Sequence, residues 1–212
     1  MSFDEENASP EALRDYYMGK YRNPNPVARW LTAGFYRALQ SILTTLPGNH
    51  RILEIGCGPG ESTRRILSML RGQHFEASEY EQRLVDLNLN EGFPVPLRQE
   101  SAYDLQRANN EFQCVLMLEV LEHLEDVDTA LREVIRVAES AVVVSVPNEP
   151  LWRFLNFARG KYWSDLGNTP GHINHWSPRA FVKLISQHGD IISVRKPLPW
   201  TIVHARPRST SE

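Results

Sequence analysis

Two carboxylates and an imidazole stand close together in the segment LEVLEHLED. Glu119, Glu122 and His123 are spaced i, i+3 and i+4, so a helical segment would project all three from one face. Carboxylate oxygens and imidazole nitrogens gathered in this way suit proton transfer or the binding of a divalent metal. Two further histidines, His172 and His175, follow in TPGHINHWS. The segment therefore predicts a site of acid–base or metal chemistry.

A second chemical feature is a run of glycines directly after an apolar segment, in RILEIGCGPGEST. The glycines are Gly56, Gly58 and Gly60. Glycine has no Cβ, so a ligand can come very close to the backbone there. Glu54 and Glu61 flank the loop, and their charges disfavour a pyrophosphate and favour a cationic ligand.

An acidic residue also ends the next predicted strand, HFEASE, at Glu79. A carboxylate at this place in a nucleotide-binding sheet can accept two hydrogen bonds from ribose hydroxyls. A ligand with a ribose and a positive charge but no phosphate indicates S-adenosylmethionine.

The elements that must position these residues alternate between apolar runs and helical patterns. We expect strands at 51–55, 74–79, 95–99, 112–118 and 141–146, and two final strands within 190–205. We expect helices at 26–46, 62–71, 81–90, 126–138 and 177–189. Such alternation predicts an α/β fold with a doubly wound, mostly parallel sheet.

The chain of 212 residues suits one domain, 1–212. We divide it into an N-terminal helical cap (1–48), a donor-binding core (49–147), a lid insertion after the fifth strand (148–176), and a C-terminal helix with strands (177–212). The insertion is long and rich in aromatic and turn residues, which is typical of a binding loop.

The segment LEIGCGPGEST resembles the first motif of the class I S-adenosylmethionine-dependent methyltransferases. The resemblance continues through ASEY, ESAYDL and FQCVLMLEVLEHLED, and it implies a Rossmann-like sheet of seven strands. ESAYDL departs from the family at Ser101, where aspartate is more frequent. The resemblance also assigns residues to the donor site, which is the site that binds the methyl donor S-adenosylmethionine. They are Glu54, Gly56, Cys57, Gly58, Gly60, Glu79, Tyr80, Ser101, Ala102, Leu118 and Glu119.

The pattern E-x-x-E-H with a later histidine is similar to a metal site of the small-RNA 2′-O-methyltransferases. The ubiquinone-biosynthesis O-methyltransferases carry a comparable pattern. This likeness implies a divalent metal held by Glu119, Glu122, His123 and His172. Two alternatives stay open: His123 or His172 acts as a general base with Glu119 lining the donor site, or these side chains are structural. His175 is interpreted as a loop anchor.

We therefore expect methyl transfer to a hydroxyl, or less readily an amine, of a small molecule, with Glu119, His123 and His172 as catalytic residues. The alternatives are an RNA 2′-O-methyltransferase, a non-catalytic donor-binding or partner domain, and a nicotinamide oxidoreductase. The glycine spacing argues against the oxidoreductase.

The net charge of −3 argues against a nucleic-acid partner. Two cysteines, an acidic N-terminus and short apolar runs predict a cytoplasmic protein without a signal peptide or membrane span. The oligomeric state stays open.

Overall fold

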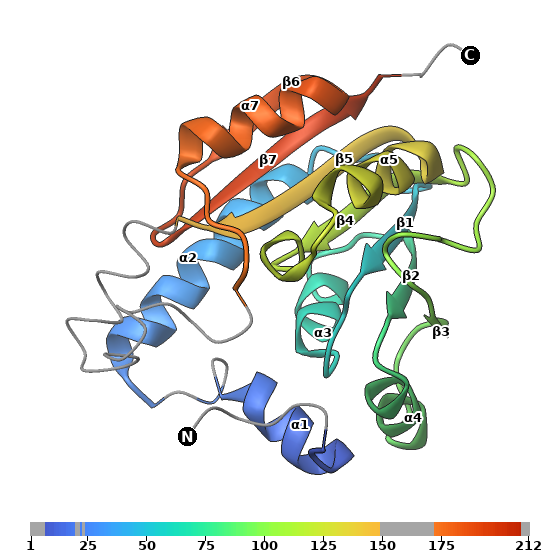
Figure 1. Ribbon diagram of the computed structural model, residues 1–212, viewed down its shortest axis with the longest axis vertical. Helices are drawn as coiled ribbons and strands as arrows, with labels where there is room; N and C mark the ends of the chain where they lie inside the picture. Colours follow the sequence, from blue (N-terminus) through green and yellow to red (C-terminus); the bar gives the residue numbers. More distant parts are fainter. Residues whose placement is uncertain (1–6, 20–21, 23, 149–171, 209–212) are drawn as a thin grey trace.

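The computed structural model describes residues 7–19, 22, 24–148 and 172–208. Seven strands form one sheet in the order β3-β2-β1-β4-β5-β7-β6 (Figure 1). The strands are β1 (Arg51–Ile55), β2 (His74–Glu79), β3 (Leu97–Gln99), β4 (Phe112–Leu118), β5 (Ala138–Pro147), β6 (Gly189–Arg195) and β7 (Trp200–Pro207). The first five pair in parallel, whereas β7 is antiparallel to both β5 and β6. The predicted seven-stranded, mostly parallel, Rossmann-like sheet is confirmed.

The central strands form because their residues are apolar on both faces. Every residue of β4 from Cys114 to Leu118 is buried, and so is every residue of β5 from Ala141 to Pro147. Strands of this kind occur where helices cover both faces of a parallel sheet. The carboxyl ends of β1, β2 and β4 therefore meet at one edge of the sheet, where they can present side chains to a ligand.

Helices cover the two faces of the sheet. The helices in the described part of the chain are α1 (Pro10–Met18), α2 (Pro26–Leu43), α3 (Glu61–Leu67), α4 (Gln82–Asn90), α5 (Val127–Val137) and α7 (Pro178–His188), and η1 (Leu121–His123) is a 3-10 turn. One apolar core lies between the sheet and α5 and α7, and a second lies between the sheet and α2 and α3. Several helices begin at a side-chain cap; Ser177, for example, accepts a hydrogen bond from the backbone N–H of Ala180.

Some boundaries differ from the sequence-based expectations. The helix expected over 62–71 ends at Leu67. Trp30, expected on the apolar stripe of 26–46, is 61% exposed, whereas Phe35 and Leu39 are buried. No loop separates the helix expected over 126–138 from the strand expected over 141–146. α5 ends at Val137, and β5 begins at the next residue, Ala138.

The N-terminal segment contains two helices with different neighbours. α2 packs on one face of the sheet, whereas α1 lies against α4 (Figure 1). An ion pair between Arg14 and Glu91 and a 2.7 Å hydrogen bond from Arg83 to the Ala8 carbonyl link α1 to the region of α4. Of the predicted lid, residues 149–171 lie outside the described part of the chain. Among the described residues, none of the helices has the length and hydropathy needed to span a membrane.

Candidate functional site

The glycine loop, residues 56–60, follows β1 at the carboxyl edge of the sheet. All three of its glycines have positive φ: 74° at Gly56, 54° at Gly58 and 80° at Gly60. A Cβ at Gly56 would lie 2.5 Å from a Val120 methyl group, and one at Gly60 would lie 2.4 Å from the Phe93 ring. A Cβ at Gly58 would meet nothing within 4 Å. Packing therefore requires the outer two glycines, while the middle glycine leaves the backbone open to a ligand.

Glu79 lies beside this loop because β1 and β2 are parallel and pair Ile55 with Ser78. Its carboxylate accepts a 2.7 Å hydrogen bond from the Gly58 N–H and a 3.0 Å bond from the Glu81 N–H. Burial raises the pKa of Glu79, against the effect of these backbone donors. Two carboxylate oxygens offer about four acceptor positions, so Glu79 can hold the loop and still accept from ribose hydroxyls.

The residues predicted near the adenine follow β2 and β3 at the same edge. Tyr80 is 69% exposed. The Glu100 N–H donates a 3.0 Å hydrogen bond to the Glu79 carbonyl, which brings Ser101 next to the end of β2. Ala102 packs into the core on the α5 side. Tyr80 and Ser101 are thus placed to border a ligand at Glu79.

Two side chains of the predicted donor set, those of Glu54 and Cys57, are buried in or beside the loop. Glu54 is 1% exposed and accepts a hydrogen bond from the Thr63 hydroxyl on α3. Burial, with the charges of Glu54 and Glu79, raises the pKa of the Cys57 thiol well above its ordinary value. Cys57 is therefore a protonated, inert thiol rather than a nucleophile.

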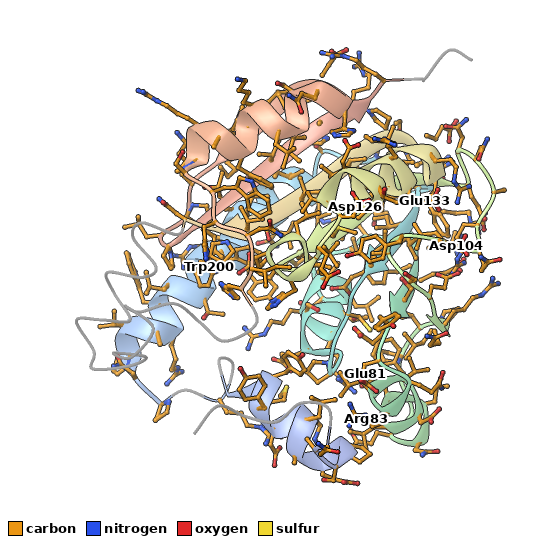
Figure 2. The ribbon with its side chains drawn as sticks, viewed as in Figure 1. Glu81, Arg83, Asp104, Asp126, Glu133 and Trp200 are labelled. Carbon is orange, nitrogen blue, oxygen red and sulfur yellow. The ribbon has the colours of Figure 1, made fainter. Side chains whose placement is uncertain are left out.

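Glu119 does not share a helix face with Glu122 and His123, so that structural expectation is wrong. Its φ is +60°, and the 3-10 turn η1, from Leu121 to His123, begins only after it. The carboxylate accepts a 3.0 Å hydrogen bond from the Ser145 hydroxyl and a 2.6 Å bond from the Trp200 indole, labelled in Figure 2. Glu119 is therefore held by β5 and β7, next to Leu118, the buried last residue of β4.

The other three candidate ligands come together from two distant segments. Each of Glu122, His123 and His172 has one ligand atom within 4.8 Å of the others, and we call these three residues the Glu–His group. The His123 and His172 rings are nearly perpendicular, with centroids 4.9 Å apart. Glu122 and His172 are buried, whereas His123 is exposed. Two imidazole nitrogens and one carboxylate oxygen form a donor set suited to Mn²⁺, Fe²⁺, Co²⁺ or Zn²⁺.

Backbone hydrogen bonds dock the segment after the predicted lid onto η1. The N–H groups of Ile173 and Asn174 donate to the Glu122 carbonyl at 2.9 and 3.1 Å. The Asn174 amide also donates to the Leu121 and Leu124 carbonyls. These contacts place His172 against His123, while His175 is exposed.

Several residues that support the site were missed by the sequence reasoning. Trp200 and Ser145 gave no local signal, because they reach Glu119 from other strands. Asn88 donates a 2.9 Å hydrogen bond to the Gly58 carbonyl. The sequence did contain a sign of this role: Asn88 is polar, yet it follows the apolar Leu84 and Val85 by four and three residues and so lies on the same helix face.

Comparisons with known proteins bear on the family and the fold. A family model described as a methyltransferase domain matches residues 27–189. A protein from Pyrococcus horikoshii OT3 superposes with a TM-score of 0.68 at 12% identity, over 92% of this chain and 99% of that one. The magnesium protoporphyrin IX methyltransferase of Synechocystis PCC 6803, solved with bound S-adenosylhomocysteine, superposes with a TM-score of 0.64 at 15% identity, over 94% and 98%. The cyclase SpnF superposes with a TM-score of 0.60 at 15% identity, over 82% and 80%. The sequence matches none of the curated proteins.

At these identities the solved structures show the fold alone, and the cyclase among them shows that the fold does not fix the reaction. The family is shown by the matched residues 27–189, which are more than half of the chain. The chain therefore belongs to the methyltransferase domain family, as a class I S-adenosylmethionine-dependent methyltransferase.

Proposed function

We propose that this enzyme methylates a hydroxyl of a small molecule and that the Glu–His group ionises that hydroxyl. The proposal rests on one observation: one ligand atom from each of Glu122, His123 and His172 lies within 4.8 Å of the others, and Glu122 and His123 belong to η1, shortly after the carboxyl end of β4. β4 pairs with β1, which leads into the glycine loop. A hydroxyl is a poor nucleophile until it loses its proton, so groups that remove or stabilise the proton belong beside the methyl donor.

The donor would lie along the glycine loop at the carboxyl edge of the sheet. Gly58 leaves room for its approach, Glu79 would bind the ribose, and Tyr80 and Ser101 would border the adenine. When bound, S-adenosylmethionine supplies a methyl group on a positively charged sulfur, open to in-line displacement. The backbone of the glycine loop and Glu79 position it, and positioning supplies much of the rate in such a reaction.

A divalent ion fits the chemistry of the Glu–His group. Glu122 would supply an oxygen, and His123 and His172 would each supply a nitrogen. Such an ion lowers the pKa of a hydroxyl that it binds. His123 is exposed and can face an acceptor, whereas buried Glu122 and His172 hold the group in place.

The charge of the chain supports a small-molecule acceptor over RNA. The net charge is −3, whereas proteins that bind nucleic acid neutralise phosphates with clustered lysine and arginine. We also propose a cytoplasmic location, because free cysteine thiols such as the buried Cys57 and Cys114 are typical of a reducing compartment.

Cobalt binding and methyl transfer together test the proposal. The wild-type protein should develop the visible absorption of protein-bound Co²⁺ and should methylate hydroxyl compounds, preferably those with two adjacent oxygens, in a panel that also contains amines. His172→Ala should lose the absorption and most of the turnover while it still binds S-adenosylhomocysteine. His74→Ala is the matched control, because this exposed histidine begins β2 at the opposite edge of the sheet.

Different outcomes separate the parts of this proposal. Methylation of amines alone would overturn the hydroxyl acceptor. Full turnover of His172→Ala would overturn the role of the Glu–His group. If His172→Ala loses turnover but the wild type shows no cobalt absorption, the metal would be overturned and a histidine would be the base that ionises the hydroxyl.

A further inference from the structure

The middle glycine of the loop is fixed on both sides by hydrogen bonds. The Gly58 N–H donates to Glu79 at 2.7 Å, and the Gly58 carbonyl accepts from the Asn88 amide at 2.9 Å. Between these two bonds the Cα of Gly58 faces open space, at a φ of +54°. The loop is thus held by its peptide groups, while the side that a ligand would approach is left free.

Asn88 lies where an apolar residue would ordinarily lie. It is 2% exposed, on the same face of α4 as the buried Leu84 and Val85. A buried amide costs free energy unless it makes hydrogen bonds. The bond to the Gly58 carbonyl supplies that partner, and burial means that water cannot easily replace the amide if it is removed.

The turn after α4 supports the loop at a second point. The Phe93 N–H donates a 3.0 Å hydrogen bond to the Asn88 carbonyl. The Phe93 ring then fills the space where a Cβ at Gly60 would lie. Figure 2 labels Glu81, the N-cap of α4, and Arg83 in its first turn. At the other end of the helix, the segment 88–93 contacts the glycine loop through Asn88 and Phe93.

We infer that Asn88 is a positioning residue for the methyl donor: it holds the Gly58 peptide so that the loop and Glu79 are already in their binding arrangement before the donor arrives. Asn88 acts through Gly58, whose N–H holds one oxygen of the Glu79 carboxylate. A loop that is fixed in advance loses less conformational entropy when the ligand binds. Removal of the Asn88 amide N–H should therefore weaken the binding of S-adenosylmethionine, although Asn88 itself does not touch that ligand. This inference rests on the proposed donor site at the glycine loop.

The decisive substitution is Asn88→Asp, which keeps the size and shape of the side chain. At neutral pH the introduced carboxylate would face the Gly58 carbonyl with an acceptor in place of a donor. Calorimetry should show S-adenosylhomocysteine bound about 10- to 100-fold more weakly than by the wild type, the scale of one buried hydrogen bond. The deficit should shrink as the pH is lowered, because the protonated carboxyl group can donate to Gly58 again.

The matched control is Asn90→Asp, the same chemical change two residues further along α4 at an exposed position. It should bind S-adenosylhomocysteine as the wild type does at every pH. A purely space-filling role for Asn88 predicts that Asn88→Asp binds normally even at alkaline pH, where its carboxyl group is ionised, and that result would overturn the inference. A deficit that is the same at all pH values would overturn it too, because loss of packing does not depend on a proton.

Two further measurements keep the test decisive. If Asn88→Asp does not fold, Asn88→Ala replaces it, and hydrogen exchange of the Gly58 amide is measured in the ligand-free protein. Faster exchange at Gly58 with unchanged exchange in β4 supports the inference. Unchanged exchange at Gly58 overturns it. Gly58→Ala tests the donor site itself. If Gly58→Ala binds S-adenosylhomocysteine normally, both the proposed donor site and the inference about Asn88 are overturned. If Gly58→Ala loses binding while Asn88→Asp keeps it, only the inference falls.

Discussion

The indole of Trp200 donates a 2.6 Å hydrogen bond to the Glu119 carboxylate, across 81 positions of the sequence. Trp200 begins β7 and also packs edge-to-face on Phe35 of α2, with ring centroids 5.3 Å apart. Glu119 follows β4 at a positive φ. One tryptophan therefore ties the helix α2, the antiparallel strand β7 and the residue after β4 into a single unit at the carboxyl edge of the sheet.

We expect Trp200→Phe to destabilise the protein through the lost hydrogen bond. A hydrogen bond to a charged group contributes about 1.5–3 kcal/mol, and less where the group is partly exposed, as Glu119 is. The free energy of unfolding, measured in urea, should fall by about 1–2 kcal/mol more than in Trp176→Phe. Trp176 is also half-buried and packs on Phe181, so the control removes the same ring atoms. Equal losses in the two variants would contradict the role of the hydrogen bond.

Alanine at the three loop glycines should separate packing from ligand access. Gly58→Ala places a methyl group in open space, so it should cost only about 1–2 kcal/mol for the left-handed backbone while it blocks S-adenosylhomocysteine binding. Gly56→Ala and Gly60→Ala should cost more in unfolding free energy, because their methyl groups would overlap Val120 and Phe93. Urea unfolding and calorimetry measure the two effects. A Gly58→Ala variant with normal affinity would be evidence against the donor site.

Stability should depend on pH through Glu76. Burial opposes ionisation of this carboxyl group, but hydrogen bonds from Arg107 and Arg51 outweigh it and lower the pKa of Glu76 below its ordinary 4.5. A carboxyl group whose pKa is lower in the folded state stabilises the fold fully above pH 4.5 and loses that contribution as the pH falls through the folded-state value.

Glu76→Gln should therefore lower the unfolding free energy by about 2 kcal/mol at neutral pH. The difference from the wild type should vanish in acid. Glu91→Gln is the control, because the Glu91 side chain is 45% exposed in its pair with Arg14 and exposed pairs contribute only ~0.5 kcal/mol. A Glu76→Gln deficit that persists unchanged in acid would show that its charge is not the cause.

Metal binding should be visible as stabilisation. Zn²⁺ or Mn²⁺ should raise the melting temperature of chelator-treated protein by several degrees, because a ligand that binds only the folded state stabilises it. Mg²⁺ should do so less, since it prefers an all-oxygen site. His172→Ala should lose the shift and His74→Ala should keep it. A shift of equal size in both variants would place the metal outside the Glu–His group.

The sequence alone determined the sheet, and it supplied the residues on which the proposed donor site is built. β1, β2 and β4 were predicted to the residue, because a glycine or an acidic residue marks the end of each. β1 and β4 are also rich in apolar residues, whereas β2 has the more polar sequence HFEASE. The glycine spacing with Glu79 indicated the ligand class, since both are local signals on neighbouring parallel strands. The short helix α3 and the exposure of Trp30 were not predictable, because packing partners rather than local propensity decide them.

Only the tertiary structure decided how the chemical residues are grouped. Spacing placed Glu119 with Glu122 and His123, whereas a single residue of positive φ turned it toward Ser145 and Trp200. Docking of the segment that contains His172 onto η1 completed the Glu–His group. Such contacts join residues far apart in the chain, and they depend on backbone turns and hydrogen bonds that no local pattern encodes.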